Sequence, residues 1–150
     1  MKVKADSPFC NCLFFTANAL GRAMTKHAEM AFAHTGLAPS HAFVVMAVNR
    51  EPGIGAGALA EAMQLERSTI TRLIDHAEQQ GWVRRAAEGR TVQLYPTSQG
   101  RAADAKLRKA WRALYEDYAR ILGGDPARKL TDDTYSAFKK LQMKSKPKEK

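Results

Sequence analysis

The chain has 150 residues, of which 45% are hydrophobic and 26% are charged, a composition typical of one globular domain. Lysine and arginine number 24 against 15 acidic residues, so the formal net charge is +9, which favours an acidic partner such as nucleic acid. No apolar run approaches the ~18 residues of a transmembrane helix, so no membrane partner is expected. With only two cysteines, the chain is not a disulfide scaffold.

The first residues superficially resemble a secretory signal, with two lysines, a short apolar run and Ala17-Asn18-Ala19. The apolar spacing, however, continues past that point in steps of four and three, which is the pattern of a helix face. The residues on this face are Leu13, Ala17, Leu20, Met24 and Ala28. We therefore expect a cytoplasmic protein.

Hydrophobic periodicity predicts a first helix over residues 9–34 that ends at Gly36. At ~1.5 Å per residue this helix is close to 40 Å long, which is more than the core of a small domain needs. A second helix, residues 39–49, is apolar nearly all round and should be buried. Two short helices follow over residues 56–63 and 66–80, after which Gly81 acts as a C-cap.

After Gly81 the apolar period changes to two, which predicts strands over residues 82–85 and 91–95, joined by a turn at Glu88-Gly89-Arg90. Thr97 or Ser98 then caps a long helix that runs to residue 122 and ends at Gly123-Gly124. A last helix is predicted to begin at Thr131, with Asp132 and Asp133 in its first turn.

Two short helices followed by a hairpin form a winged helix-turn-helix, whose second helix fits the major groove of DNA. Arg67, Ser68, Thr69 and Thr71 should contact base edges. Arg72, Arg84 and Arg85 could reach phosphates, and Arg90 could enter the minor groove. The predicted DNA-binding residues are Arg67, Ser68, Thr69, Thr71, Arg72, Arg84 and Arg90. The alternative is that the arginines only pair with acidic neighbours, namely Glu66, Asp75, Glu78 and Glu88.

Residues 9–143 resemble the MarR-type (multiple antibiotic resistance) transcriptional regulators. The sharpest stretch, residues 59–85, reads LAEAMQLERSTITRLIDHAEQQGWVRR and is similar to the family pattern ELAxxLxxxxxTxTRLIDRLExxGLVRR. The family's wing pattern D-R-R-S-x-x-V-x-L-T lies over residues 88–97 without a gap, and Gly100 follows as in the family.

The predicted elements and this resemblance together imply a mainly α protein with a small β-hairpin wing, forming a single domain over residues 1–150. The winged helix-turn-helix would be residues 38–97, the dimerisation helices residues 9–36 and 98–143, and a disordered basic tail residues 144–150. The resemblance also implies a homodimeric repressor that binds a pseudo-palindromic operator in double-stranded DNA. A near-heptad seam in the long helix agrees with packing against another long helix; it comprises Leu107, Trp111, Leu114, Tyr118 and Ile121.

The chain departs from the family at two places. Glu88 stands where the family usually has Asp, and Gly89 replaces an arginine, so Arg90 is the one basic residue left at the wing tip. Ala38 stands where the family has a Thr cap, and losing that cap costs about 1 kcal/mol unless Ser40 replaces it.

Members of the family usually lose DNA affinity when a small aromatic ligand, an oxidant or a metal binds. The resemblance implies an effector pocket between the first, second and fifth helices, and no cofactor. Cys10 and Cys12 are candidates for redox or metal sensing, and simple packing is the alternative. Residues 13–26 resemble the organic-hydroperoxide sensors of the family, but the sensing position of that branch falls on Phe14. His34, His41 and His76 match no recognised metal signature with these cysteines.

An enzyme is not expected, because no paired-carboxylate site or Ser/His/Asp signature is present, and the glycines of residues 53–57 follow no predicted strand. The sequence therefore predicts a sequence-specific, DNA-binding transcriptional regulator. The alternative function is a winged-helix module that binds DNA without sequence preference or binds protein.

Overall fold

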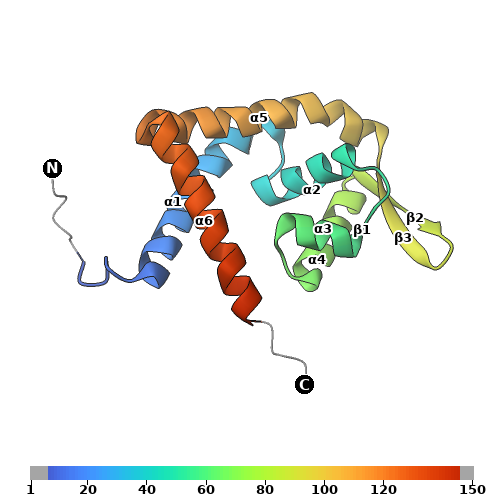
Figure 1. Cartoon of the computed structure of the whole chain (residues 1–150). Helices are drawn as coiled ribbons and strands as arrows, with labels where there is room; N and C mark the ends of the chain where they lie inside the picture. Colours follow the sequence, from blue (N-terminus) through green and yellow to red (C-terminus); the bar gives the residue numbers. More distant parts are fainter. Residues whose placement is uncertain (1–6, 146–150) are drawn as a thin grey trace, which may run out of the picture. The chain divides into compact units, whose positions relative to one another are not determined.

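The computed structural model describes residues 7–145, with side chains as far as residue 143. It confirms a mainly helical fold with a small sheet (Figure 1). The chain divides into two compact units, one ending at Arg112 and the other beginning at Ala113. The elements in order are α1 (Leu13–Phe32), the 3-10 turn η1 (Ala33–Thr35), α2 (Pro39–Arg50), β1 (Ile54–Gly55), α3 (Ala56–Met63), α4 (Arg67–Gln79), β2 (Val83–Glu88), β3 (Thr91–Pro96), α5 (Ser98–Leu122) and α6 (Gly124–Ser145).

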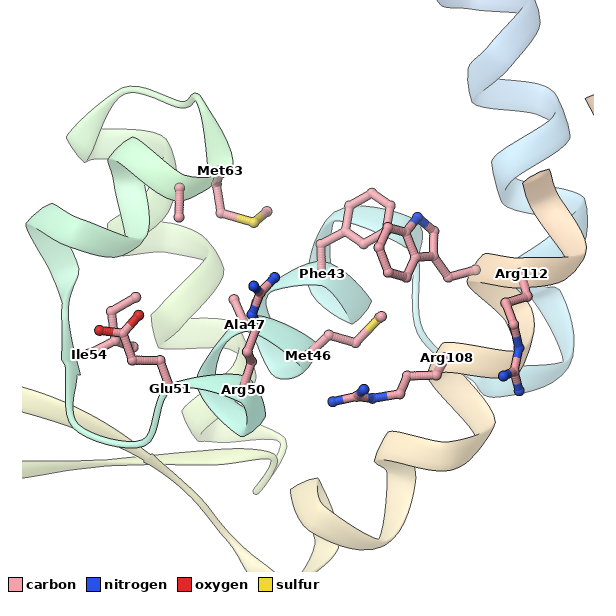
Figure 2. A pocket seen from close by; sticks show the side chains of 11 residues that line it. Phe43, Met46, Ala47, Arg50, Glu51, Ile54, Met63, Arg108 and Arg112 are labelled. Atoms are coloured by element: carbon pink, nitrogen blue, oxygen red, sulfur yellow. The ribbon is translucent and has the colours of Figure 1, made fainter. Parts of the chain in front are cut away.

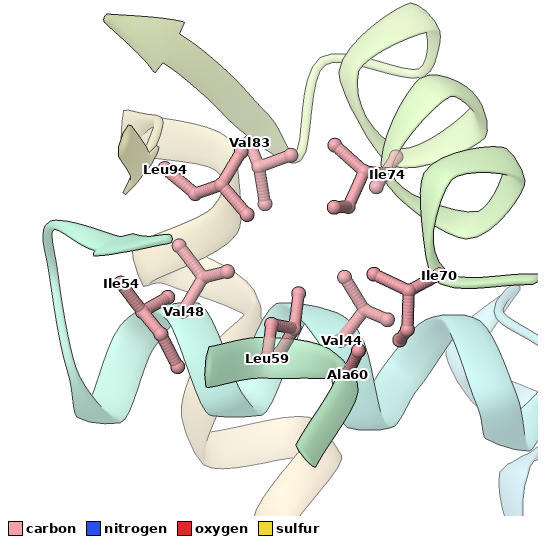
Figure 3. Packing of buried hydrophobic residues seen from close by; sticks show 10 residues of the cluster. Val44, Val48, Ile54, Leu59, Ala60, Ile70, Ile74, Val83 and Leu94 are labelled. Carbon is pink, nitrogen blue, oxygen red and sulfur yellow. The ribbon is translucent and has the colours of Figure 1, made fainter. Parts of the chain in front are cut away.

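One hydrophobic core joins α2, α3, α4 and the strands of the first unit (Figure 3). Ile54 of β1 is 5% exposed, and the core side chains that are at most 1% exposed come from α2, α3, α4, β2 and β3: Val44, Val48, Leu59, Ile70, Ile74, Val83 and Leu94. A fully buried aliphatic side chain contributes about 1.5–3 kcal/mol. The core therefore holds α4 in a fixed position relative to α2 and to the base of the wing.

The sheet has three antiparallel strands in the order β1-β3-β2. The sequence predicted β2 and β3 but no strand in the segment where β1 lies. Ile54 is opposite Leu94, and the Gly53 amide donates to the Leu94 carbonyl at 2.7 Å. Two residues are too few to show the alternation of apolar and polar side chains that predicts a strand. Only the pairing with β3 therefore defines β1.

The wing turns through a two-residue loop, Gly89-Arg90, between the paired residues Glu88 and Thr91. Gly89 has a φ of 62°, which the first central position of a II′ hairpin turn requires and which favours glycine. The Thr91 hydroxyl donates to the Glu88 carbonyl at 2.9 Å. The positive φ of this turn position therefore explains why Gly89 stands where the family has an arginine.

Several helix ends agree with the sequence. Gly36, Gly81 and Gly123 all have positive φ where their helices end, as glycine C-caps require. Thr97 caps α5, because its hydroxyl accepts from the Gly100 amide at 3.0 Å. Ala38 precedes α2 without any side-chain cap, so Ser40 does not replace the missing threonine.

Two helix starts differ from the prediction. Residues 9–12 form turns, in which the Phe9 amide donates to the Ser7 hydroxyl at 3.2 Å, and α1 begins only at Leu13. The last helix begins at Gly124 rather than at Thr131, because a proline such as Pro126 is tolerated in a first helical turn. The predicted tail begins inside α6, which continues to Ser145, and residues 146–150 lie outside the described residues.

In the second unit, the end of α5 and all of α6 are joined at Gly123. The Ala127 amide donates to the Gly123 carbonyl at 2.9 Å, and Arg128 donates to the Tyr115 hydroxyl at 3.3 Å. Only part of the predicted seam is buried, since Leu107 and Leu114 are buried while Trp111 and Ile121 are exposed.

Within residues 7–145, no single helix is both long and apolar enough to cross a membrane. One bent pair, residues Leu13–Thr35 with Pro39–Arg50 at 65°, meets the length and composition requirement when the two are counted together.

Candidate nucleic-acid interface

Helix α4 has one buried face and one exposed polar face. Ile70, Ile74 and Ala77 are buried in the core. Most of the predicted DNA-contacting residues of α4 lie on the exposed side: Arg67, Ser68, Thr71 and Arg72 are exposed, and Thr69 is half-buried. Because the buried face of α4 packs in the core, the orientation of its polar face relative to the rest of the unit is fixed. A helix that inserts into a DNA groove needs such a fixed orientation.

The chain enters α4 through a tight turn after α3. Gln64 has a φ of 56° in this turn, and the Leu65 amide donates to the Ala60 carbonyl at 3.0 Å. Arg67 is the first residue of α4. The Thr71 hydroxyl donates to the Arg67 carbonyl at 2.9 Å, so this hydroxyl still has lone pairs to accept from a partner.

A polar cluster on the wing holds Arg84, and the sequence did not reveal its other members. The Arg84 guanidinium carbon lies 4.8 Å from the centre of the Tyr95 ring, a cation–π distance. The Tyr95 hydroxyl donates to the Glu88 carboxylate, and this bond raises the pKa of Tyr95. The Gln93 amide nitrogen, turned toward its acceptors, donates to Glu88 at 3.0 Å and to the Gly53 carbonyl at 3.1 Å. In the sequence, the observation that pointed to this cluster was that Glu88 stands at the position where the family usually has Asp.

Arg85, which the sequence predicted could reach phosphates, has carboxylate partners within the domain. Its guanidinium pairs with Glu78 and, at 2.5 Å, with Asp75, and its amide donates to Glu78 at 3.1 Å. Burial acts to lower the pKa of Arg85, but the bonds to Asp75 and Glu78 outweigh it and raise the pKa. The pairing of arginines with acidic neighbours is therefore confirmed for Arg85, which ties β2 to α4.

Arg90 occupies the second position of the wing loop and is exposed. The adjoining residues Gly89 and Thr91 are also exposed. A guanidinium at the end of a hairpin that is anchored in the core can extend away from the domain without losing any packing. This is the position from which the sequence predicts a minor-groove contact.

Cys10 and Cys12 are both exposed free thiols. Cys10 lies in the turn before α1, where its amide donates to the Ser7 carbonyl at 3.3 Å. Cys12 is the N-cap residue of α1, and its carbonyl accepts from the Thr16 amide at 3.0 Å. Their exposure leaves both thiols accessible to an oxidant.

Two of the three histidines considered as metal ligands lie next to each other. The rings of His41 on α2 and His76 on α4 lie 4.2 Å apart between centroids, whereas His34 is exposed on η1. Burial, and then the neighbouring His76, lower the pKa of His41. Among the described residues, no group of three or more His, Cys, Asp or Glu side chains is arranged to hold a metal ion.

A cleft of about 760 Å³ lies in the first unit (Figure 2). Its apolar wall includes Phe43, Met46 and Met63, and Trp111 lies against it with 55% of its surface exposed. Three arginines surround this wall: Arg50, Arg108 and Arg112. The lining residues come from α2, β1, α3, α5 and the α2–β1 turn, and none comes from α1, so this cleft differs from the effector pocket that was expected between the first, second and fifth helices.

Known proteins share both sequence and fold with this chain. Residues 35–91 match a family model described as the MarR family. The HTH-type transcriptional regulator TtmR of Methylorubrum extorquens (strain PA1) is 29% identical over 105 residues, which are 68% of this chain and 52% of TtmR. The match therefore spans about half the length of that relative.

Solved structures agree in fold. The transcriptional repressor CouR bound to a 23-mer DNA duplex has a TM-score of 0.75 and 21% identity, covering 83% of this chain and 91% of CouR. PcaV of Streptomyces coelicolor, in complex with its natural ligand, has a TM-score of 0.78 and 19% identity, covering 91% of this chain and 98% of PcaV. Over residues 35–91 the chain is thus similar to the MarR family, and it shares the winged helix-turn-helix fold of the solved transcriptional regulators.

Proposed function

We propose that the protein is a transcriptional regulator that binds a specific, pseudo-palindromic operator in double-stranded DNA. It acts as a homodimeric repressor in the cytoplasm and releases the operator when a small ligand, an oxidant or a metal binds. Arg67, Ser68, Thr69 and Thr71 read base edges, Arg72 and Arg84 contact the phosphate backbone, and Arg90 enters the minor groove.

One observation carries the proposal: the first turns of α4 present a polar, basic face on a helix whose opposite face is buried in the core. Arginine, serine and threonine are side chains that read base edges in the major groove. Arg67 and Arg72 take part in no ion pair among the described residues, so both guanidinium groups are available to DNA. CouR, whose fold this chain shares, was solved bound to a 23-mer DNA duplex, which supports DNA binding by this fold.

The homodimer is supported by apolar side chains that the first and last helices leave exposed. Phe14 on α1 is 79% exposed and Tyr135 on α6 is 54% exposed, and a large amount of exposed apolar surface is one mark of an interaction site. Further exposed apolar residues on these helices are Leu13, Met30, Leu130 and Leu141. A second copy of the chain buries both helices and pairs two α4 helices for a two-fold symmetric site.

An effector role is supported by the cleft between α2, α3 and α5. Its apolar wall suits an aromatic ring, and its arginines suit a carboxylate or a similar anion. PcaV, with a related fold, was solved with its natural ligand, and CouR with p-coumaroyl-CoA. Exposed Cys10 and Cys12 support release by an oxidant as a second route.

The test is DNA binding by the full chain, using duplexes selected from a random pool and scrambled controls at several salt concentrations. The selected duplex should bind orders of magnitude more tightly than the scrambled one. Arg67→Ala should remove about 1–3 kcal/mol of this discrimination, since a bidentate base contact is lost. Arg90→Ala should weaken binding to both duplexes. It should also reduce the slope of log affinity against log salt concentration by about one, as expected for the loss of one phosphate contact.

Equal and steeply salt-dependent binding to both duplexes would instead favour a module that binds DNA without sequence preference, and no binding to either would favour a protein-binding module. Adding mild peroxide or a small aromatic acid to the same assay tests the two routes of release. A Cys10→Ser/Cys12→Ser variant is the control for peroxide.

A further inference from the structure

The side chain of Arg67 folds back from α4 across the first turn of α3. A Cβ atom built on Gly57 would lie 2.7 Å from the Arg67 Nη1 atom and 3.8 Å from its Cζ atom. Real Cβ atoms essentially never come as close as 2.7 Å to another heavy atom. The guanidinium of Arg67 therefore occupies space that is open only because residue 57 has no side chain.

Backbone conformation does not explain the glycine at this position. Gly57 lies within helix α3 and is not among the glycines with positive φ, whereas Gly53 and Gly81 are. Alanine fits a helical backbone and stabilises a helix relative to glycine. The feature that a side chain at residue 57 would disturb is thus the position of the Arg67 guanidinium.

Arg67 is held less firmly than Arg85. Arg85 pairs with two carboxylates, but among residues 7–143 no ion pair fixes Arg67. The guanidinium of Arg67 lies where a side chain at residue 57 would be, so adding a methyl group there would displace it.

We propose that Gly57 is a positioning residue for DNA reading: its missing side chain leaves a notch that sets the direction in which Arg67 approaches a base. This inference rests on the proposed function. An arginine recognises guanine through two parallel hydrogen bonds from a planar fork, and such recognition is lost when the fork is displaced by a fraction of an ångström or turned by 10–20°.

The experiment compares the wild type, Gly57→Ala, Arg67→Ala and the double variant. Each protein selects duplexes from a random pool, and its affinity for the duplex selected by the wild type is then measured. Gly57→Ala should lose about tenfold in affinity and should change its base preference at the position where Arg67→Ala changes it. In the Arg67→Ala background, Gly57→Ala should have no further effect.

Thermal unfolding separates positioning from folding, because Gly57→Ala should unfold at the same or a higher temperature than the wild type. Gly55→Ala is the matched control, since nothing lies within 4 Å of a Cβ at Gly55, and it should keep the wild-type base preference. The inference is overturned if Arg67→Ala changes base preference while Gly57→Ala does not, or if Gly57→Ala loses affinity equally without Arg67. If the wild type selects no sequence at all, the proposed function itself fails, and the role of Gly57 fails with it.

Discussion

Arg84 and Arg85 are neighbours on β2 with different surroundings. Arg85 faces α4 and is bound by Asp75 and Glu78, while Arg84 faces the other side of the strand and lies over the Tyr95 ring. The alternation of side chains along a strand separates the two roles. One arginine ties the wing to the core, and the next remains available to a phosphate.

This difference predicts opposite effects of two matched substitutions. Arg85→Ala should lower the free energy of unfolding by about 1 kcal/mol, because two partly exposed ion pairs are lost. Arg84→Ala should change stability less but should weaken DNA binding at low salt. Urea denaturation and DNA titration measure the two quantities. Equal losses of stability in both variants would contradict the assignment of Arg85 as the structural residue.

Gly100 allows a second prediction at a single residue. A Cβ at this position would lie 2.1 Å from the Trp82 carbonyl oxygen, which is backbone and cannot rotate away. Gly100→Ala should therefore lower the free energy of unfolding by about 1–3 kcal/mol or more, as overpacking does. Gly124→Ala, where nothing lies within 4 Å of the added atom, is the control. Wild-type stability of Gly100→Ala in urea would show that α5 starts in a different position.

At the scale of elements, the position of α4 depends on its contact with α2. The His41 and His76 rings join the two helices at 4.2 Å, above a core in which Val44 and Ile74 are buried. Two neutral rings pack at this distance, but two protonated rings repel each other. Protonation therefore opposes packing at this helix contact.

The histidine pair predicts a pH dependence of stability. Burial, and then the charge of His76, hold the pKa of His41 below its ordinary value of 6.5, so the unfolded chain binds protons more readily than the folded one. The free energy of unfolding should thus fall as the pH drops below about 6.5, until the folded-state pKa is passed. His41→Gln should flatten this decline, measured as urea midpoints between pH about 7.5 and about 5. His34→Gln is the control and should retain the wild-type profile.

At the scale of the whole molecule, the proposed homodimer rests on the exposed apolar residues of α1 and α6. Phe14 and Tyr135 lie on long helices whose apolar side chains are only partly covered within one chain. Exposed apolar area of this kind is costly in water, and burying it against a second copy is favourable. Association of two chains then determines whether two α4 helices contact one DNA site together.

Tyr135→Asp tests this association. The substitution should shift the protein from dimer toward monomer in sedimentation equilibrium, because it places a charge in an apolar contact. Apparent DNA affinity should fall about a hundredfold or more, because a dimer that binds two linked half-sites gains a factor of about 10²–10⁴ in affinity over a monomer that binds one. Thr134→Asp, on the same helix, is a control for the added charge alone. A wild-type protein that sediments as a monomer would contradict the homodimer directly.

The sequence by itself was sufficient for features that neighbouring residues determine. The limits of α3, the glycines that follow η1 and α5, the Thr97 cap and the polar face of α4 all follow from periodicity and turn chemistry within a few residues. Such patterns act over one or two helical turns, so they can be read without knowing what lies across the fold.

The tertiary structure decided whatever depends on contact between distant segments. It paired β1 with β3, gave Arg85 its carboxylates, brought His41 to His76 and set Arg67 against Gly57. A two-residue strand has no period, and a guanidinium has the same chemistry whether it meets a carboxylate, an aromatic ring or solvent. The partner of each such group is selected by how the core packs the helices and strands together, which no local pattern encodes.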